Sequence, residues 1–309
     1  MNGIVNLFKP AGMTSFSAAA AVRRISGERK CGHGGTLDPE ATGVLPVLLG
    51  KATRLSDVFL TLPKTYEARL RFGRSYDTGD VWGNVIAELT PEQERRLAAL
   101  TDEEISAAAT MFTGPIAQVP PAYSALKIGG VPAYKLARKG EVPELKARIV
   151  NVYSIETGEL TEGPEGREVT LRVKCGRGTY IRTLCCDIAA QLGFPGAMAS
   201  LVRTSYGPLT LENALTPDQF TAAASAVSAA SAAEGNTTDL PGFILPCETI
   251  LGGFDRIELT GQEADDYRFG RPILVDRPDS ELLRVYAEGR LLGLGTVTGG
   301  NLKSRINLS

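Results

Sequence analysis

The sequence predicts an α+β protein with one large domain and a small C-terminal β domain. Alternating apolar and polar residues at 65 to 73 and 168 to 175 are typical of strands, and Thr101 with Glu104 forms a capping box that opens a helix between them. From about residue 241 the chain offers only short strand-like runs separated by Gly and Pro. With 309 residues, of which 43% are hydrophobic, it can form a substantial core.

The N-terminal segment reads as a strand at 3 to 8 followed by a helix from Thr14 and Ser15 to about Ile25. The segment from Lys30 to Ser56 comes next, and its many glycines and prolines oppose a regular helix, which predicts a shaped loop. Asp38 lies at its centre. Its carboxylate is either a reactive group on a preorganised backbone or a partner of turn amides.

The segment 113 to 140 mixes prolines, glycines, tyrosines and cations without a sustained period. A segment of this length without regular structure is usually functional or disordered. Its aromatic and cationic residues fit an arm that stacks on bases and neutralises phosphates, or an ordinary surface loop. The residues of this kind are Tyr123, Lys127, Tyr134, Lys135 and Arg138.

Two strands at about 148 to 156 and 168 to 175 lead to a predicted helix from Thr179 to about Leu192. Arg182 lies near the start of this helix, beside its apolar stripe. A cation there is unfavourable to the helix dipole, so Arg182 either extends to solvent or meets a specific anion.

A low-complexity, almost uncharged run from Ala222 to Leu240 reads as a linker or insertion. We therefore expect a large domain at 1 to 220, a linker at 221 to 240 and a small β domain at 241 to 309.

Composition excludes several classes of protein. The chain has no apolar run of membrane-spanning length and no signal-peptide pattern, so we expect a cytoplasmic protein with no membrane partner. One histidine and five irregularly spaced cysteines argue against a zinc site. Up to Arg203 the chain holds 25 Lys and Arg against 21 Asp and Glu, and the remainder holds 8 against 14. This asymmetry is expected if the first part meets an anionic partner.

Five motifs in order resemble the TruB-type tRNA pseudouridine synthases. They are GIVNLFKPAGMTS, GHGGTLDPEATGVLPVLLGKATR, KTYEARLRFG, QVPPAYSALKIGGVPAYKLARKG and CGRGTYIRTL, and together they cover most of residues 3 to 210. The resemblance implies a mixed, largely antiparallel sheet flanked by helices, with an RNA-gripping insertion at about 113 to 148. It also implies a PUA-like RNA-binding domain at the C-terminus.

The resemblance also implies roles for individual residues. Asp38 matches the catalytic aspartate of the family, and Arg182 matches the arginine that pairs with it. The resemblance places Tyr66 and Leu201 at the target base and His33 at the T-loop. Tyr180 is a further candidate for the wall of that pocket, and we expect five residues in all to bind the substrate. The set is Lys9, His33, Tyr66, Tyr180 and Leu201.

The implied reaction converts the T-loop uridine of tRNA to pseudouridine. It needs no metal or cofactor, and the carboxylate acts either as a nucleophile or in removing a ribose proton. The uridine must be flipped out of the tRNA fold into a pocket. The alternative is a non-catalytic protein that binds or refolds RNA. The expected partner is the T-arm of tRNA, and we expect a monomer.

Overall fold

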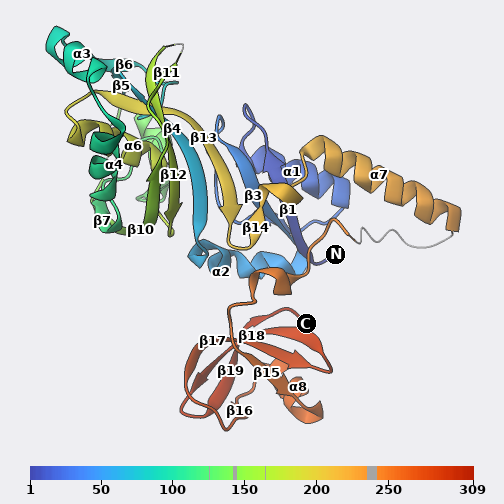
Figure 1. Cartoon of the computed structure of the whole chain (residues 1–309). Helices are drawn as coiled ribbons and strands as arrows, with labels where there is room; N and C mark the ends of the chain where they lie inside the picture. Colours follow the sequence, from blue (N-terminus) through green and yellow to red (C-terminus); the bar gives the residue numbers. More distant parts are fainter. Residues whose placement is uncertain (125, 142–144, 164, 235–241) are drawn as a thin grey trace. The chain divides into compact units, whose positions relative to one another are not determined.

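The computed structural model (Figure 1) describes residues 1–309 except 125, 142–144, 164 and 235–241, and it describes only the backbone of 227–234. Contacts divide the chain into two compact units. Unit 1 comprises Met1–Pro39, Val44–Leu60 and Gly207–Ser309, and unit 2 comprises Glu40–Gly43 and Thr61–Tyr206. The division into domains at 1 to 220, 221 to 240 and 241 to 309 remains a prediction.

The N-terminal part of unit 1 confirms the predicted strand and helix. Strand β1 is Gly3–Lys9 and helix α1 is Ser15–Ser26, with Thr14 as its N-cap accepting a hydrogen bond from the main-chain N–H of Ser17. The other elements here are β2 (Cys31–His33), η1 (Gly50–Leu55), α2 (Ser56–Thr61), β14 (Leu209–Thr210) and η2 (Leu211–Asn213). Buried apolar residues of β1, α1 and β3 form one core cluster with Phe220.

The prediction of a continuous loop from Lys30 to Ser56 is wrong for much of this segment. Strand β3 runs over Thr42–Leu49, despite Gly43 and Pro46, and β2 pairs with it antiparallel. All of β3 except Thr42 is buried, so burial of its apolar side chains outweighs the low strand preference of glycine and proline. Gly43 has φ +106°, and a side chain there would clash with the main chain of Arg203. The irregular segment is confined to residues 34 to 41.

Helix α7 (Pro217–Glu234) covers much of the low-complexity run, which the sequence reading did not predict. Alanine has the highest helix propensity, and Phe220 and Ala224 anchor the first turns in the core cluster. The rest of the run, 235 to 240, lies outside the described residues.

The C-terminal part of unit 1 is a small β domain, as predicted, with one additional helix, α8 (Gly261–Arg268). A short helix η3 (Cys247–Ile250) precedes a five-stranded sheet of order β15-β17-β18-β19-β16. The strands are β15 (Arg256–Leu259), β16 (Ile273–Leu274), β17 (Ser280–Ala287), β18 (Arg290–Thr298) and β19 (Asn301–Asn307). Tyr267 of α8 packs in the core of this sheet.

Unit 2 is built on a mixed, largely antiparallel sheet with the strand order β13-β4-β12-β10-β7. Its pairings are antiparallel, whereas Thr42 and Gly43 run parallel to β13. One face of the central strands is apolar and buried, and the other carries exposed charged residues such as Glu67 and Arg172. The strands are β4 (Lys64–Phe72), β7 (Gly114–Gln118), β10 (Arg148–Thr157), β12 (Gly166–Cys175) and β13 (Gly196–Tyr206), with β11 (Thr161–Gly163) pairing with β12.

Helices α4 (Asp102–Thr110) and α6 (Ile181–Gln191) pack on this sheet, α6 against β4 and β13 and α4 against β10 (Figure 1). The capping box of Thr101 and Glu104 is confirmed. Helix α3 (Pro91–Ala98) and the hairpin β5 (Arg74–Tyr76) with β6 (Val85–Glu88) were not predicted. The described part of the 113 to 148 segment holds β7, β8 (Lys127–Ile128), β9 (Val131–Pro132) and α5 (Ala133–Ala137).

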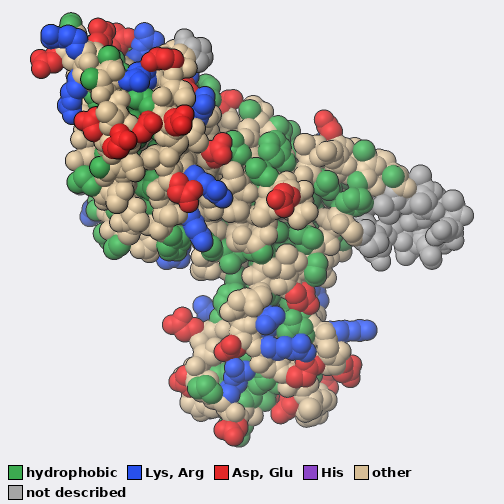
Figure 2. Space-filling model, viewed as in Figure 1, with side chains coloured by type: hydrophobic (Ala, Val, Ile, Leu, Met, Phe, Trp, Pro, Cys, Tyr) green, Lys and Arg blue, Asp and Glu red, His purple; other side chains and the backbone are tan. Residues whose placement is uncertain are grey.

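Surface charge does not single out a binding face in the view of Figure 2. Over α3, β5 and β6, the side chains of Lys and Arg are interspersed with those of Asp and Glu. Among the described residues, no helix combines the length and apolarity required to cross a membrane.

Candidate active site

The segment that carries Asp38 is held by a buried lysine. The Lys9 side chain is 0% exposed, and its Nζ donates to the main-chain oxygens of Pro10 at 2.8 Å, Met13 at 2.7 Å and Pro39 at 2.7 Å. An ammonium group has three donors, and an ion buried to this degree must be compensated. Lys9 therefore ties the turn after β1 to the residue that follows Asp38.

Ser15 holds the residue on the other side of Asp38. Its buried hydroxyl donates to the main-chain oxygen of Leu37 at 3.0 Å and accepts from the main-chain N–H of Leu37 at 2.8 Å. Since both neighbours of Asp38 are fixed by buried side chains, its backbone has little freedom. The Asp38 side chain is half-buried, as is His33 at the end of β2.

Tyr66 and Leu201 lie on neighbouring strands of unit 2. Tyr66 of β4 pairs with Arg203 of β13, and Ala68 pairs with Leu201. Residues two apart on a strand share a face, so the half-buried Tyr66 and the buried Leu201 are diagonal neighbours on one face of the sheet.

The start of α6 is anchored by Gln118, a buried residue of β7. The Gln118 side chain accepts from the Tyr180 N–H at 2.8 Å and donates to the Tyr180 main-chain oxygen at 3.0 Å. Tyr180 is the N-cap residue of α6, and its side chain is half-buried. This bidentate contact fixes the position of Arg182 two residues further on.

Arg182 is buried, so of the two alternatives left by the sequence it does not extend to solvent. Its guanidinium donates to the main-chain oxygens of Thr78 at 2.8 Å and Tyr123 at 2.7 Å. Its Nε lies 3.7 Å from the carboxylate of Asp80. One of its anions is therefore Asp80, for which the sequence predicted no role.

A second group that the sequence reading missed surrounds the buried phenol of Tyr206. The ammonium of Lys64 lies 4.6 Å from the ring centroid and the guanidinium of Arg203 lies 4.9 Å from it. Burial lowers the pKa of Lys64 to about 8, and burial raises the pKa of Tyr206. Lys64 of β4 pairs with Tyr206 of β13, and the register shifts between Arg203 and Ser205, so strand periodicity could not have indicated this group.

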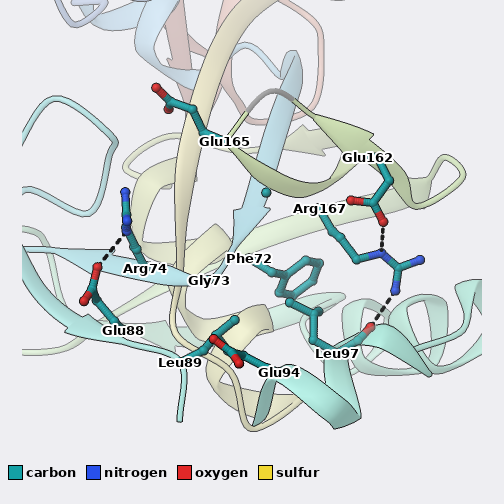
Figure 3. Close-up of a pocket in the computed structure, with 11 residues that line it drawn as sticks. Phe72, Gly73, Arg74, Glu88, Leu89, Glu94, Leu97, Glu162, Glu165 and Arg167 are labelled. Atoms are coloured by element: carbon teal, nitrogen blue, oxygen red, sulfur yellow. Dashed lines mark hydrogen bonds and ion pairs between the residues drawn. The ribbon is translucent and has the colours of Figure 1, made fainter. Parts of the chain in front are cut away.

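The hollow shown in Figure 3 holds none of the predicted site residues. It has a volume of about 550 Å³ and an apolar floor that includes Phe72, Leu89 and Leu97. Its rim carries ion pairs, with Arg74 2.8 Å from Glu88 and Arg167 3.0 Å from Glu162. We do not assign the reaction to this hollow.

The predicted site residues thus fall into two sets, one in each unit. Unit 1 holds Lys9, His33 and Asp38, of which Lys9 and Asp38 belong to one braced segment. Unit 2 holds Tyr66 with Leu201 on the sheet and Tyr180 with Arg182 at the start of α6. The roles of these residues remain predictions.

Two solved structures have a fold similar to that of this chain. The solved structure described as "Crystal Structure of a Cbf5-Nop10-Gar1 Complex" is similar with a TM-score of 0.69 and 26% identity, over 96% of this chain and 78% of that chain. A second, "Structure of H/ACA RNP bound to a substrate RNA containing 2'-deoxyuridine", has a TM-score of 0.71 at 23% identity, over 99% and 85% of the two chains. The second likeness shows the fold alone.

Three protein-family descriptions match successive parts of the chain. Residues 23–181 match "TruB family pseudouridylate synthase (N terminal domain)". Residues 182–252 match "tRNA pseudouridylate synthase B C-terminal domain", and residues 256–306 match "Pseudouridine synthase II TruB, C-terminal". The chain belongs to the TruB family of pseudouridylate synthases.

Curated relatives extend the likeness over nearly the whole chain. A protein of Streptococcus pneumoniae serotype 2 (strain D39) is 40% identical over 99% of both chains. One from Aromatoleum aromaticum is 39% identical over 98% of this chain and 91% of that chain, and one from Clostridium tetani is 36% identical over 98% of both. All three are named tRNA pseudouridine synthase B. The protein is accordingly a pseudouridine synthase, an isomerase, as the resemblance implied.

Proposed function

We propose that this pseudouridine synthase acts on tRNA, converting the uridine of the T-loop, with Asp38 as the catalytic carboxylate. Its curated relatives carry the name tRNA pseudouridine synthase B, which supports tRNA as the substrate. The observation that carries the assignment of Asp38 is the bracing of its two neighbours by Lys9 and Ser15. A backbone held in this way presents a carboxylate in one position, which is what catalysis by a positioned group requires.

The reaction is a rearrangement with no net loss of atoms. The bond from N1 of uracil to C1′ of ribose breaks, the base turns, and C5 bonds to C1′. C5 then loses a proton and N1 gains one. The carboxylate of Asp38 acts at the ribose, either as a nucleophile at C1′ or by removing and returning a ribose proton. Both routes need Asp38 to be ionised.

We propose that Arg182 is the partner of Asp38 during the reaction, because a cation paired with a carboxylate lowers the free energy of its ionised form. Its buried contacts with Thr78, Tyr123 and Asp80 give it a fixed orientation. Tyr66, Tyr180 and Leu201 form the wall that receives the flipped base and replaces its lost stacking. His33 contacts the RNA.

The substrate is tested with purified protein and full-length tRNA transcripts. We expect pseudouridine at one T-loop position and none in a transcript in which that uridine is replaced by cytidine. A matched transcript with an unfolded T-arm gives much less product if the folded loop is recognised. Product at positions outside the T-arm would contradict the proposed substrate, and the enzyme class would stand.

A further inference from the structure

The single tryptophan of the chain lies in a turn whose Asp80 carboxylate faces Arg182 of the candidate site. We propose that Trp82 is a stacking platform for an unpaired base of the RNA substrate, next to the base that reacts. The inference rests on the proposed function, since it names a further contact of the same site. Trp82 is the one Trp in the sequence, and it is 50% exposed.

The turn that carries Trp82 is rigid. It joins β5 to β6, and the Asp77 carboxylate accepts from the main-chain N–H of Asn84 at 2.8 Å and from its side-chain amide at 3.0 Å. These bonds lower the pKa of Asp77, with the Asn84 side chain as the largest cause. A side chain at Gly83 would clash with Thr78 and Asp77, so the turn closes tightly around this glycine.

The same turn is bound to Arg182. The Asp80 carboxylate accepts from the Trp82 N–H at 3.3 Å and from the Thr78 hydroxyl at 2.7 Å, and it faces Nε of Arg182 at 3.7 Å. The main-chain oxygen of Thr78 also accepts from Arg182. One carboxylate therefore links the backbone of Trp82 to the guanidinium.

The turn is further fixed to the strand that carries Leu201. The Val81 N–H donates to the main-chain oxygen of Met198 at 3.1 Å, and the Met198 N–H donates to that of Gly79 at 3.1 Å. Gly79 also packs close to the Cβ of Arg182. The backbone of Trp82 is thus held from both sides, although half of the residue is exposed.

An exposed indole on a rigid backbone suits a base better than other partners. It offers a large flat surface and loses little conformational entropy on binding. Base stacking on an aromatic side chain accepts any base. When the target uridine is flipped out, its neighbours in the loop lose a stacking partner, and Trp82 supplies a replacement.

The test uses the intrinsic fluorescence of the full-length protein, because Trp82 is its sole tryptophan. Titration with a T-arm stem-loop RNA should change the emission saturably, and the same stem without its loop should not. Steady-state kinetics compare wild type with Trp82→Ala and Trp82→Phe. We expect Trp82→Ala to raise KM about 5- to 150-fold with kcat nearly unchanged, and Trp82→Phe to recover most of the loss.

Ile86→Ala is the matched control, because Ile86 is 66% exposed on β6 of the same hairpin. Circular dichroism melts verify that each variant is folded. Emission that does not respond to RNA, a KM unchanged in Trp82→Ala, or an equal rise in Ile86→Ala would overturn the stacking role. Inactive wild-type protein whose emission still responds would instead count against the proposed function.

Discussion

Two buried cations brace the two sets of candidate residues, and they do so differently. Lys9 in unit 1 donates to three main-chain oxygens, those of Pro10, Met13 and Pro39. Arg182 in unit 2 donates to two main-chain oxygens and also faces the Asp80 carboxylate. An ammonium is a point donor, whereas a guanidinium is a planar fork whose directions are fixed. We infer that Lys9 fixes the backbone on either side of the contacts that it makes. Arg182, in contrast, has its own side chain held in one orientation, in which it can take part in the reaction.

The largest expected effect follows from removing Lys9. Lys9→Met should lower the free energy of unfolding by about 3 to 5 kcal/mol, because three hydrogen bonds from a buried charged donor are lost. Urea unfolding followed by circular dichroism measures it, with Lys174→Met on the exposed face of β12 as the control. A loss no greater than that of the control would refute the bracing role of Lys9.

Arg182→Lys tests whether the orientation of the cation matters, because it keeps the positive charge and removes the planar guanidinium. We expect kcat to fall about 100-fold, the cost of a small misplacement in a catalytic constellation. The control is Arg172→Lys, because Arg172 is exposed and its contact with Glu156, at 4.0 Å, is loose. Single-turnover rates at saturating RNA measure the effect on the reaction. Equal rates in the two variants would show that the orientation of the Arg182 guanidinium does not matter.

Ser15→Ala should have a smaller effect than either. It removes the two hydrogen bonds to Leu37 and leaves the Lys9 contacts intact, so we expect a stability loss of about 1 to 2 kcal/mol. Ser106→Ala, at an exposed position of helix α4, is the control. Both variants are compared by thermal unfolding, and indistinguishable curves would mean that Ser15 does not restrain the segment.

A further prediction concerns the dependence of stability on pH. Burial lowers the pKa of Lys64 from 10.5 to about 8, so between these values the unfolded chain binds a proton that the folded protein has lost. Stability should therefore rise with pH across this window, relative to Lys64→Gln, and the full cost of the buried charge should be present below pH 8. Urea unfolding from pH 7 to 10 tests this, and parallel curves for the two proteins would contradict it.

Regular elements were predictable wherever local pattern and tertiary burial agree. Strand β4 alternates over its whole length, and the caps at Thr14 and Thr101 are formed as expected. Strand β3 was missed because Gly43 and Pro46 oppose a strand locally, while burial against the core decides its conformation. Helix α7 was missed because an alanine-rich run reads equally as a linker.

The candidate site was less accessible to sequence reasoning. Asp38 and Arg182 could be proposed because motifs single them out, but the contacts that orient them join residues far apart in the chain. Lys9 reaches Pro39, and Arg182 reaches Thr78 and Tyr123. Asp80 could not be predicted, since nothing in its local sequence shows that Arg182 packs beside it.

Asp38 is the proposed catalytic carboxylate, and its substitution is the most direct test of that role. Asp38→Asn keeps the shape of the side chain and removes its charge, and Glu40→Gln is the control for loss of a nearby carboxylate. Both are assayed for pseudouridine in a T-arm RNA and for binding of the same RNA. We expect Asp38→Asn to bind the RNA nearly as well as wild type and to form no pseudouridine. Pseudouridine formed by purified Asp38→Asn at a rate close to that of Glu40→Gln would show that Asp38 is not the catalytic carboxylate.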